Sequence, residues 1–263
     1  MRILKKTIAF IFLISLVLSL IGCTVPTDCD QGQAPIRGET VDLTEAIKNK
    51  DKIEFKLGDL AILGAYEQDG DRENGPERIE WMVLALEEDK ALLLSEKILD
   101  SKAYNQEHAK VTWESCSLRA WLNDEFYKTA FSEEEKQIIL ASLLSNENTY
   151  KKRIEGGNDT EDKVFLLSYN EATNPTYGFN PDYSQKDSLR LAGGSDYAIS
   201  QGLFVIPSWK ENESSDYNYW WLRSPGGSQK HSTMVRWDGS IFRKGYYVNY
   251  SYIGVRPAVW IKL

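Results

Sequence analysis

Short apolar runs between polar turns predict β-strands in the first third of the chain. Leu60–Tyr66, Ile79–Leu86 and Ala91–Leu94 are each four to eight residues long, the usual length of a buried or half-buried strand. The charged tetrapeptide EEDK connects the last two runs, so we expect them to form a hairpin. A short helix is expected before them, over residues 41–49.

The pattern predicts strands again at the C-terminal end. Tyr219–Arg223 has the composition of one strand, and MVRWDGSIFR that of a hairpin. The Asp238-Gly239 pair in that hairpin suits a tight type I′ turn. The final segment, GVRPAVWIKL, is expected to form the last strand, with Pro257 indicating an edge or a bulge.

Two helices are predicted between these groups of strands. The apolar residues Leu118, Trp121, Leu122 and Phe126 recur at i, i+3, i+4 and i+8, which places them on one helix face. The next segment, SEEEKQIILASLL, opens with a serine three residues before a glutamate, Ser132 and Glu135 in this chain. This spacing is typical of a capping box at a helix N-terminus.

A long irregular stretch follows the predicted helices. Lys163–Ser168 is expected to form a strand, and residues 169–217 are rich in Asn, Gly, Ser, Asp and Tyr. Only the segment GLFVIPSW interrupts this stretch as a further candidate strand. So long a loop region within a compact domain is usually functional or inserted.

The start of the chain has the order of features found in a secretory signal. Arg2, Lys5 and Lys6 precede an apolar run over residues 8–21, which ends in Leu-Ile-Gly-Cys. This ending resembles the lipobox of bacterial lipoproteins, which implies cleavage before Cys23 and a diacylglycerol on its thiol. An uncleaved membrane span is the alternative, but the run is shorter than the ~20 apolar residues that a span needs.

This interpretation divides the chain into three parts. Residues 1–22 are the expected signal peptide, residues 23–50 the lipidated cysteine and a flexible tether, and residues 51–263 a single domain. Residues 24–40 carry Pro, Gly and polar residues without periodicity, as a tether does. The lipid would hold the protein to a bacterial membrane surface without spanning it, so an extracytoplasmic location is expected.

The expected mature chain is acidic, which excludes two classes of partner. The full chain has a net charge of −8, and residues 1–22 hold three basic residues and no acidic one, so their removal leaves −11. Nucleic-acid binding is not expected, because phosphates require a basic footprint. The same charge argues against a domain that lies flat on anionic lipid.

Cysteine and histidine are too sparse for the usual metal or redox sites. Besides Cys23 the chain holds Cys29 and Cys116, which an exported protein can join. The polar tether around Cys29 and the predicted helix around Cys116 favour a free, packed Cys116 instead. No CxxC pair is present, and the histidines are His108 and His231. We therefore expect neither a zinc centre nor another cofactor.

Four sequence blocks occur together in one order. They are IEWMVLALEEDKALLLSEKILDSKAYN, VTWESCSLRAWLNDEFYKTAFSEEEKQIIL, YWWLRSPG and GVRPAVWI. The blocks resemble an uncharacterised domain family of bacterial surface proteins and lipoproteins, over residues 55–263. That family implies no particular activity for this chain.

More distantly, the chain resembles C-type-lectin-like domains of the formylglycine-generating-enzyme type. This resemblance implies an α+β fold: a mixed, mainly antiparallel sheet, two helices packed on it, and a long-loop region over 169–217. It also implies that Val255–Ile261 lies beside a strand drawn from residues 53–66. The paired cysteines of the copper oxidases are absent, as are the Glu-Pro-Asn and Trp-Asn-Asp motifs of calcium-dependent lectins. Neither of those activities is expected.

Other motifs that carry chemistry are incomplete. DGDRENGPERIE places Asp69, Asp71, Glu73 and Glu80 at the offsets of a calcium loop, but Asn74 occupies the glycine position and no helix precedes it. An acidic hairpin tip is the favoured interpretation. No complete nucleophile or phosphate-binding motif is present. A carboxylate pair for glycoside hydrolysis stays open, because a sequence does not show the separation of the two groups.

Aromatic residues concentrate in the second half of the chain. Of the 22 Trp and Tyr residues, 15 lie within 165–263. Many flank turns, namely Tyr177, Tyr183, Tyr197, Trp209, Tyr217, Tyr246, Tyr247, Tyr250 and Tyr252. Exposed aromatics among Asn, Asp and Ser suit a sugar or a protein surface. The alternative is a loop held together by its own tyrosine hydroxyl bonds.

The stretch NYWWLRSPGG contributes to the same hypothesis. Successive side chains of a strand face opposite sides, so Trp220 and Leu222 should build the core while Trp221 and Arg223 face the loops. Structural tethering of loop carbonyls by Arg223 and Arg256 is the favoured alternative. The candidate ligand-binding residues are Trp221, Arg223, Trp209, Tyr217 and Tyr247, and no catalytic or metal-binding residue is assigned.

These observations predict a lipid-anchored extracytoplasmic domain that binds a glycan or a protein ligand. An extracytoplasmic hydrolase that uses the 169–217 loop region is one alternative. A purely structural envelope component is the other.

Overall fold

The computed structural model describes residues 38–149, 153–206 and 216–263. The expected signal peptide, Cys23 and Cys29 lie outside the described residues, as does Trp209. Among the residues that are described, no helix is long and apolar enough to cross a membrane.

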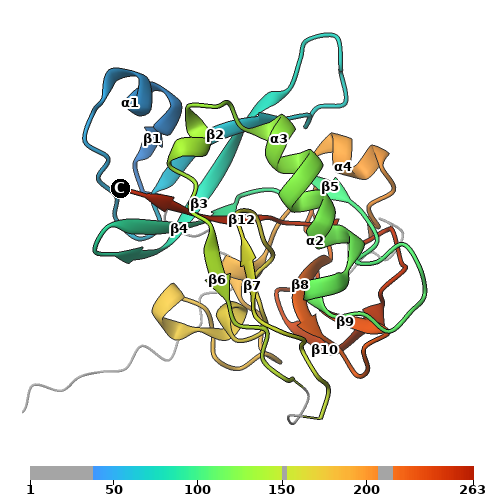
Figure 1. Ribbon diagram of the computed structural model, residues 1–263. Helices are drawn as coiled ribbons and strands as arrows, with labels where there is room; N and C mark the ends of the chain where they lie inside the picture. The colour runs from blue at the N-terminus through green and yellow to red at the C-terminus, as the bar shows by residue number, and fades with distance from the viewer. Residues whose placement is uncertain (1–37, 150–152, 207–215) are drawn as a thin grey trace, which may run out of the picture. The chain divides into compact units, whose positions relative to one another are not determined.

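The first sheet has five strands in the order β1-β2-β3-β4-β12. They are β1 (Thr40–Asp42), β2 (Leu60–Tyr66), β3 (Glu77–Glu87), β4 (Lys90–Ser95) and β12 (Ala258–Lys262). The β1–β2 pair is parallel and the other pairs are antiparallel. Figure 1 shows the last strand of the chain, in dark red, entering this sheet beside β4. The predicted first strand and the following hairpin are therefore confirmed.

A second sheet lies mostly in the C-terminal part of the chain, in the order β10-β9-β8-β11-β5. Its strands are β5 (Asp100–Ser101), β8 (Trp220–Pro225), β9 (His231–Val235), β10 (Ile241–Tyr247) and β11 (Gly254–Val255). Only the β8–β11 pair is parallel. Figure 1 shows β8, β9 and β10 side by side in orange and red. The architecture is thus α+β and mainly antiparallel, as predicted, but the described strands form two five-stranded sheets and a two-stranded one instead of the single sheet expected.

The expected neighbour of the terminal strand is wrong. Ala258 pairs with Leu94 and Lys262 with Lys90, so β12 lies against β4, with β3 and β4 between it and β2. A break at Pro257 divides the segment, so that the residues before it join the second sheet and those after it join the first. Proline has no N–H to donate, and its carbonyl accepts from Ser95 N at 2.9 Å while β11 joins the other sheet.

The folded part begins before residue 51. The predicted short helix is α1 (Leu43–Asn49), which Asp42 caps by accepting the N–H of Glu45 at 3.2 Å. Leu43 is fully buried. Consequently residues 40–50 of the expected 23–50 tether belong to the domain, because β1 and α1 contribute to its sheet and its core.

The first predicted helix is confirmed as a continuous helical segment. It comprises α2 (Ser117–Trp121), the π-helix η2 (Leu122–Phe126) and α3 (Tyr127–Ala130), after the short 3-10 helix η1 (Trp113–Ser115). Its buried face carries Leu118, Leu122 and Phe126. Cys116 at its start is a buried free thiol, and burial raises its pKa to about 12, so it is unreactive.

The second predicted helix is wrong beyond its first turn. The capping box forms, because Ser132 N donates to the Glu135 carboxylate at 2.9 Å and Glu135 N donates to Ser132 Oγ at 3.2 Å. Only the 3-10 helix η3 (Glu135–Gln137) follows it. The chain then extends, since Leu140 N donates to Trp260 O, and Lys262 N to Ile138 O, both at 2.8 Å. Pairing with β12 has replaced helical hydrogen bonds.

Two short strands and a buried segment follow in the described parts of residues 142–168. The strands β6 (Ser142–Leu144) and β7 (Thr160–Asp162) pair with each other. Residues 164–167 are fully buried, but the expected strand is reduced to a bridge between Phe165 and Ala258. Packing against the core, rather than a full ladder, positions this segment.

The described part of 169–217 is irregular, as predicted. It contains the short helices η4 (Glu171–Thr173), η5 (Pro175–Tyr177), η6 (Ser188–Arg190) and α4 (Asp196–Ser200). Residues 202–206, the described part of GLFVIPSW, form no strand.

The β9–β10 hairpin is confirmed, but its turn is not type I′. Arg236 N donates to Ser240 O at 2.8 Å, so the loop has three residues, and only Gly239 among them has a positive φ, of 78°. A type I′ turn needs two such residues, whereas a type I turn followed by a left-handed glycine needs one. Asp238 favours the latter, because its carboxylate accepts the N–H of Ser240 at 3.0 Å.

Candidate functional site

The two tryptophans of NYWWLRSPGG both belong to the core. Trp220, Trp221 and Leu222 are fully buried. The Trp221 ring meets Tyr104 edge-on at 6.0 Å, and its Nε1 donates to Lys102 O at 3.0 Å. The assignment of Trp221 to a ligand is therefore wrong. Alternation along a strand separates core from surface only when one face of the sheet is open, and β8 is a central strand covered on both faces.

Arg223 tethers loop carbonyls, which is the alternative to ligand binding that the sequence favoured. It is 4% exposed and forms a bidentate ion pair with Glu171, with Nη2 at 3.0 Å from Oε1. Its other donors reach Leu166 O at 2.9 Å and Ser145 O at 3.2 Å. The guanidinium nitrogens of Arg223 already donate to protein oxygens, so few of its N–H groups are available to a ligand.

Arg256 has the same structural use. Its Nε donates to Ser95 O at 2.8 Å, and the guanidinium lies over Trp220 at 5.1 Å from the ring centre. Complete burial lowers the pKa of Arg256 to about 10. These contacts join the two sheets, because Ser95 lies in β4 and Trp220 in β8.

The remaining candidates, Tyr217 and Tyr247, are both 40% exposed. Tyr247 lines a surface hollow, whereas Tyr217 lines none of the hollows described below. The structure therefore keeps Tyr247 as the best-placed of the predicted ligand residues.

Tyr247 belongs to a continuous group of exposed and half-buried rings that we call the aromatic surface. Its members are Phe204, Tyr219, Phe242, Tyr246, Tyr247, Tyr250 and Tyr252. Two hollows indent it, one of about 580 Å³ and one of about 470 Å³. Tyr246 lines both, so the hollows are adjacent parts of one surface.

The two hollows differ in their other walls. The larger is lined by Phe204, Val205, Tyr219, Tyr246, Tyr252 and Ile253, with two further residues of the same loop. The smaller is lined mainly by His231, Phe242, Lys244, Tyr246, Tyr247 and Tyr250. One is almost wholly apolar or phenolic, and the other adds a lysine and an imidazole.

A β-bulge in the edge strand β10 displays these tyrosines. The register shifts between Phe242 and Tyr246, and Gly245 within the bulge has a φ of 65°. A Cβ at that position would lie 1.8 Å from the carbonyl oxygen of Ser232, so only glycine fits. β10 is an edge strand in the order of the described strands, and its Tyr246 and Tyr247 are 38% and 40% exposed.

The rings form a track with regular contacts. Tyr252 and Tyr250 have centroids 5.0 Å apart, Tyr250 and Tyr246 5.9 Å, and Tyr246 and Phe242 5.6 Å. Phe204 extends the track beyond Tyr252 at 6.3 Å, and its N–H donates to Tyr252 O at 2.9 Å. Backbone pairing and ring contacts thus hold two separate loops in one surface.

The tyrosine hydroxyls of this track are not used to hold the loop. Within the described parts of the chain, those of Tyr246, Tyr247, Tyr250 and Tyr252 form no hydrogen bond. A loop held by its own hydroxyls is seen elsewhere, where Arg243 donates to Tyr183 Oη at 2.8 Å. For these four tyrosines of the aromatic surface, the alternative of a self-bonded loop is therefore not supported.

Both histidines of the chain lie against Tyr247. His231 is 4.4 Å and His108 4.8 Å from its ring centre. The Nδ1 of His231 lies 2.8 Å from Ser228 Oγ. Burial, together with the neighbouring His108, lowers the pKa of His231. The imidazole of His231 is consequently harder to protonate than that of a free histidine.

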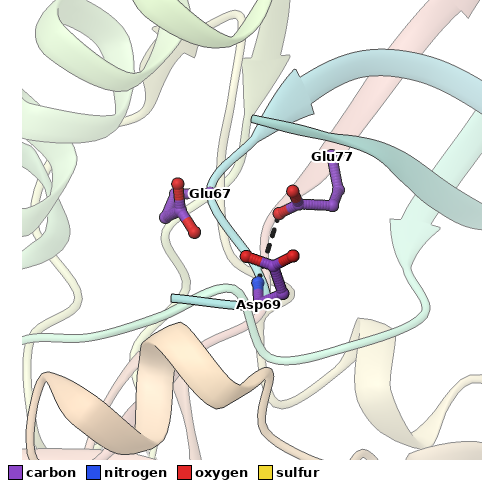
Figure 2. Close-up of side chains that lie close together, drawn as sticks. All are labelled: Glu67, Asp69 and Glu77. Carbon is purple, nitrogen blue, oxygen red and sulfur yellow. Dashed lines mark hydrogen bonds between the residues drawn. The ribbon is translucent and has the colours of Figure 1, made fainter. Parts of the chain in front are cut away.

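An acidic group at the tip of the β2–β3 hairpin is the other arrangement with chemical potential. Glu67, Asp69 and Glu77 each place a carboxylate oxygen within 4.8 Å of the others (Figure 2). Glu77 accepts the N–H of Gln68 at 2.6 Å and that of Asp69 at 3.2 Å, the bond dashed in Figure 2. These carboxylates cap the turn, which matches the predicted acidic hairpin tip.

Sequence reasoning missed several residues of the aromatic surface. Phe204 stood in a segment expected to be a strand, and His108 and His231 were weighed only as zinc ligands. Lys244 had no recognisable motif. A useful signal was available in YYVNYSY, where four tyrosines in seven residues exceed what one strand face can bury.

Comparison with protein families matches residues 88–263 to the family described as Domain of unknown function (DUF6273). The chain belongs to this family. The DUF6273 region begins in the β3–β4 turn, later than the expected start at residue 55, and contains the whole aromatic surface. The strands β1, β2 and β3 precede it and extend its first sheet. Comparisons with curated proteins and with solved structures found no significant match.

Proposed function

We propose that this protein is a glycan-binding module and that the aromatic surface is its ligand site. One observation carries the proposal: a continuous aromatic surface of seven rings is indented by two adjacent hollows, and within the described residues the hydroxyls of Tyr246, Tyr247, Tyr250 and Tyr252 form no hydrogen bond with the protein. Phenol rings offer apolar area for the C–H faces of sugars, and their hydroxyls donate and accept hydrogen bonds.

The shape of the site favours a chain of sugars over a small compact ligand. The track runs from Phe204 through Tyr252, Tyr250 and Tyr246 to Phe242, with neighbouring centroids 5.0–6.3 Å apart. An extended polymer can contact several rings in succession, whereas a single sugar meets one or two. Few rotamers need to be frozen on binding, because a tyrosine side chain has only two rotatable angles.

We further propose that the module is lipid-anchored and extracytoplasmic. The basic residues, the apolar run and the Leu-Ile-Gly-Cys ending support this proposal through their order in the sequence. The C-type-lectin-like relationship is likewise a proposal, and the long irregular region between two mainly antiparallel sheets supports it.

The ligand site is tested by substitution within the track. Tyr246→Ala should weaken binding to the best glycan of an array by about 10-fold or more, because this ring lines both hollows. Leu57→Ala is the matched control, since Leu57 is 60% exposed and lines neither hollow. Equal affinities of the two variants would refute the assignment. Selective binding of a protein, with no glycan hit, would favour the protein-ligand alternative, and turnover of a hit would favour the hydrolase.

The anchor is tested at Cys23. Cys23→Ser should abolish incorporation of labelled fatty acid and leave an unprocessed precursor, because the lipid bonds to the thiol. Metabolic labelling followed by mass measurement distinguishes the forms. Normal labelling and cleavage of the variant would contradict the lipoprotein proposal.

A further inference from the structure

Positive charge is concentrated at the aromatic surface of an otherwise acidic protein. Residues 228–252 contain the four basic residues Lys230, Arg236, Arg243 and Lys244 and the single acidic residue Asp238, while the whole chain has a net charge of −8. Asp238 is occupied within the hairpin turn, where it accepts from Ser240 N and Oγ. The local field at β9 and β10 is therefore positive.

Two of these cations are available to a ligand. Arg243 stacks on Tyr183 at 3.7 Å, and Arg236 lies over Phe242 at 4.6 Å. In the described residues, by contrast, Lys230 and Lys244 form no ion pair. Lys244 is exposed and lines the smaller hollow.

The imidazoles bring further donors to the same hollow. His231 lines it with Lys244, and His108 contacts Tyr247, the neighbour that it shares with His231. Tyr247 in turn lies 5.5 Å from Tyr250, a ring of the track. Lys244 and His231 thus line the same hollow as Tyr246 and Tyr250, so a sugar stacked on these rings can bring a substituent to them.

We propose that the aromatic surface binds an acidic polysaccharide, with sugar rings on Tyr246 and Tyr250 and ring carboxylates at His231 and Lys244. This inference rests on the proposed glycan-binding function and names its ligand class. In a uronic acid the carboxylate is attached to the stacked ring itself, which suits a hollow lined both by tyrosine rings and by Lys244 and His231. Acidic residues elsewhere on the protein would repel such a polymer, so the positive region also selects this surface.

Binding should strengthen as the pH falls. The groups around His231 are His108, Tyr247 and Ser228 Oγ, with Lys244 in the same hollow. A bound carboxylate favours the protonated imidazole, so the complex takes up a proton and its affinity rises between about pH 7.5 and 5.5. The free protein changes in the opposite sense. Folding lowers the pKa of His231, so the unfolded chain binds more protons than the folded one near this pKa. The free energy of unfolding of the ligand-free protein therefore decreases as the pH is lowered.

The test compares two polymers that differ only in charge. Oligogalacturonate and its fully methyl-esterified form are titrated into the full-length protein in detergent, at about pH 7.5 and 5.5 and constant ionic strength. We expect the acidic form to bind about 10-fold more tightly, and the difference to grow at the lower pH. Lys244→Met should reduce the preference, whereas Lys128→Met should preserve it, because Lys128 pairs with Asp124 outside both hollows. Replacing both histidines with asparagine should remove the pH dependence.

The outcomes separate the two proposals. Equal binding of both polymers at both pH values would overturn the acidic-ligand inference and leave the glycan site intact. Equal binding of poly-glutamate and oligogalacturonate would also overturn it, since charge without a sugar would then suffice. Failure of every glycan to bind would overturn both.

Discussion

Trp220→Ala and Trp221→Ala should each lower the free energy of unfolding by about 3–5 kcal/mol, the usual cost of emptying a buried tryptophan site. Both rings are fully buried. Each Nε1 donates to a backbone carbonyl, Trp220 to Arg190 O at 2.9 Å and Trp221 to Lys102 O at 3.0 Å. The loss is a large part of the roughly 5–15 kcal/mol that stabilises an ordinary domain. Urea denaturation of both variants measures it.

Tyr246→Ala is the control for this pair of variants. Its ring is 38% exposed, so it should lose much less stability than either tryptophan variant while losing ligand binding. A loss below about 1 kcal/mol for Trp221→Ala would show that its ring is not part of the core.

Strand alternation had suggested that the two tryptophans differ in kind. It assigned one face of Trp220–Arg223 to the core and the other to a ligand, which is valid for a sheet with one wet face. Here both faces are covered: Trp221 packs on Tyr104 and the Arg223 side chain reaches Glu171, while Trp220 donates to Arg190 O. The periodicity of a strand states which residues share a face, and only the rest of the fold decides what covers it.

Local patterns predicted the elements whose hydrogen bonds are local. The boundaries of Leu60–Tyr66 were correct, as was the β3–β4 hairpin, because apolar runs and charged turns specify both. The helix after Ser132 failed for the opposite reason. Its capping box formed as predicted, but the following residues found partners in β12, more than a hundred residues away. Such long-range competition leaves no trace in the local pattern.

The candidate site was predicted only in part, for a related reason. Tyrosines near turns were recognised as ligand candidates, and Tyr247 proved to lie in a hollow. The convergence of Phe204 with Tyr252, and of His108 with His231 on one ring, depends on loops that meet through tertiary contacts. A sequence shows the residue types that could form such a surface, and the fold selects those that do.

Arg190 illustrates a structural role that the sequence did not reveal. It is fully buried, and its five N–H groups donate to five backbone carbonyls: Gly239, Ala172, Asn180, Asp182 and Gln185. These acceptors lie in the irregular region and in the β9–β10 turn. One guanidinium therefore ties the long loops to the hairpin that carries the aromatic surface.

Arg190→Lys should consequently destabilise the fold despite keeping the charge. A lysine has three donors on a flexible stem, so at least two of the five carbonyls would lose their partner in a buried site. Hydrogen bonds to charged groups contribute about 1.5–3 kcal/mol each, so we expect a loss of about 3–5 kcal/mol in denaturant unfolding. Arg243→Lys is the matched control, because Arg243 is half-buried and donates to a tyrosine hydroxyl, that of Tyr183, instead of to buried backbone carbonyls. If the two variants unfolded at the same denaturant concentration, the loops would have to be held by their own packing. Acidic-glycan binding should then survive in both.

If Arg190 is the tether, amide exchange in residues 172–187 should accelerate in its variant alone, because local opening exposes those backbone groups.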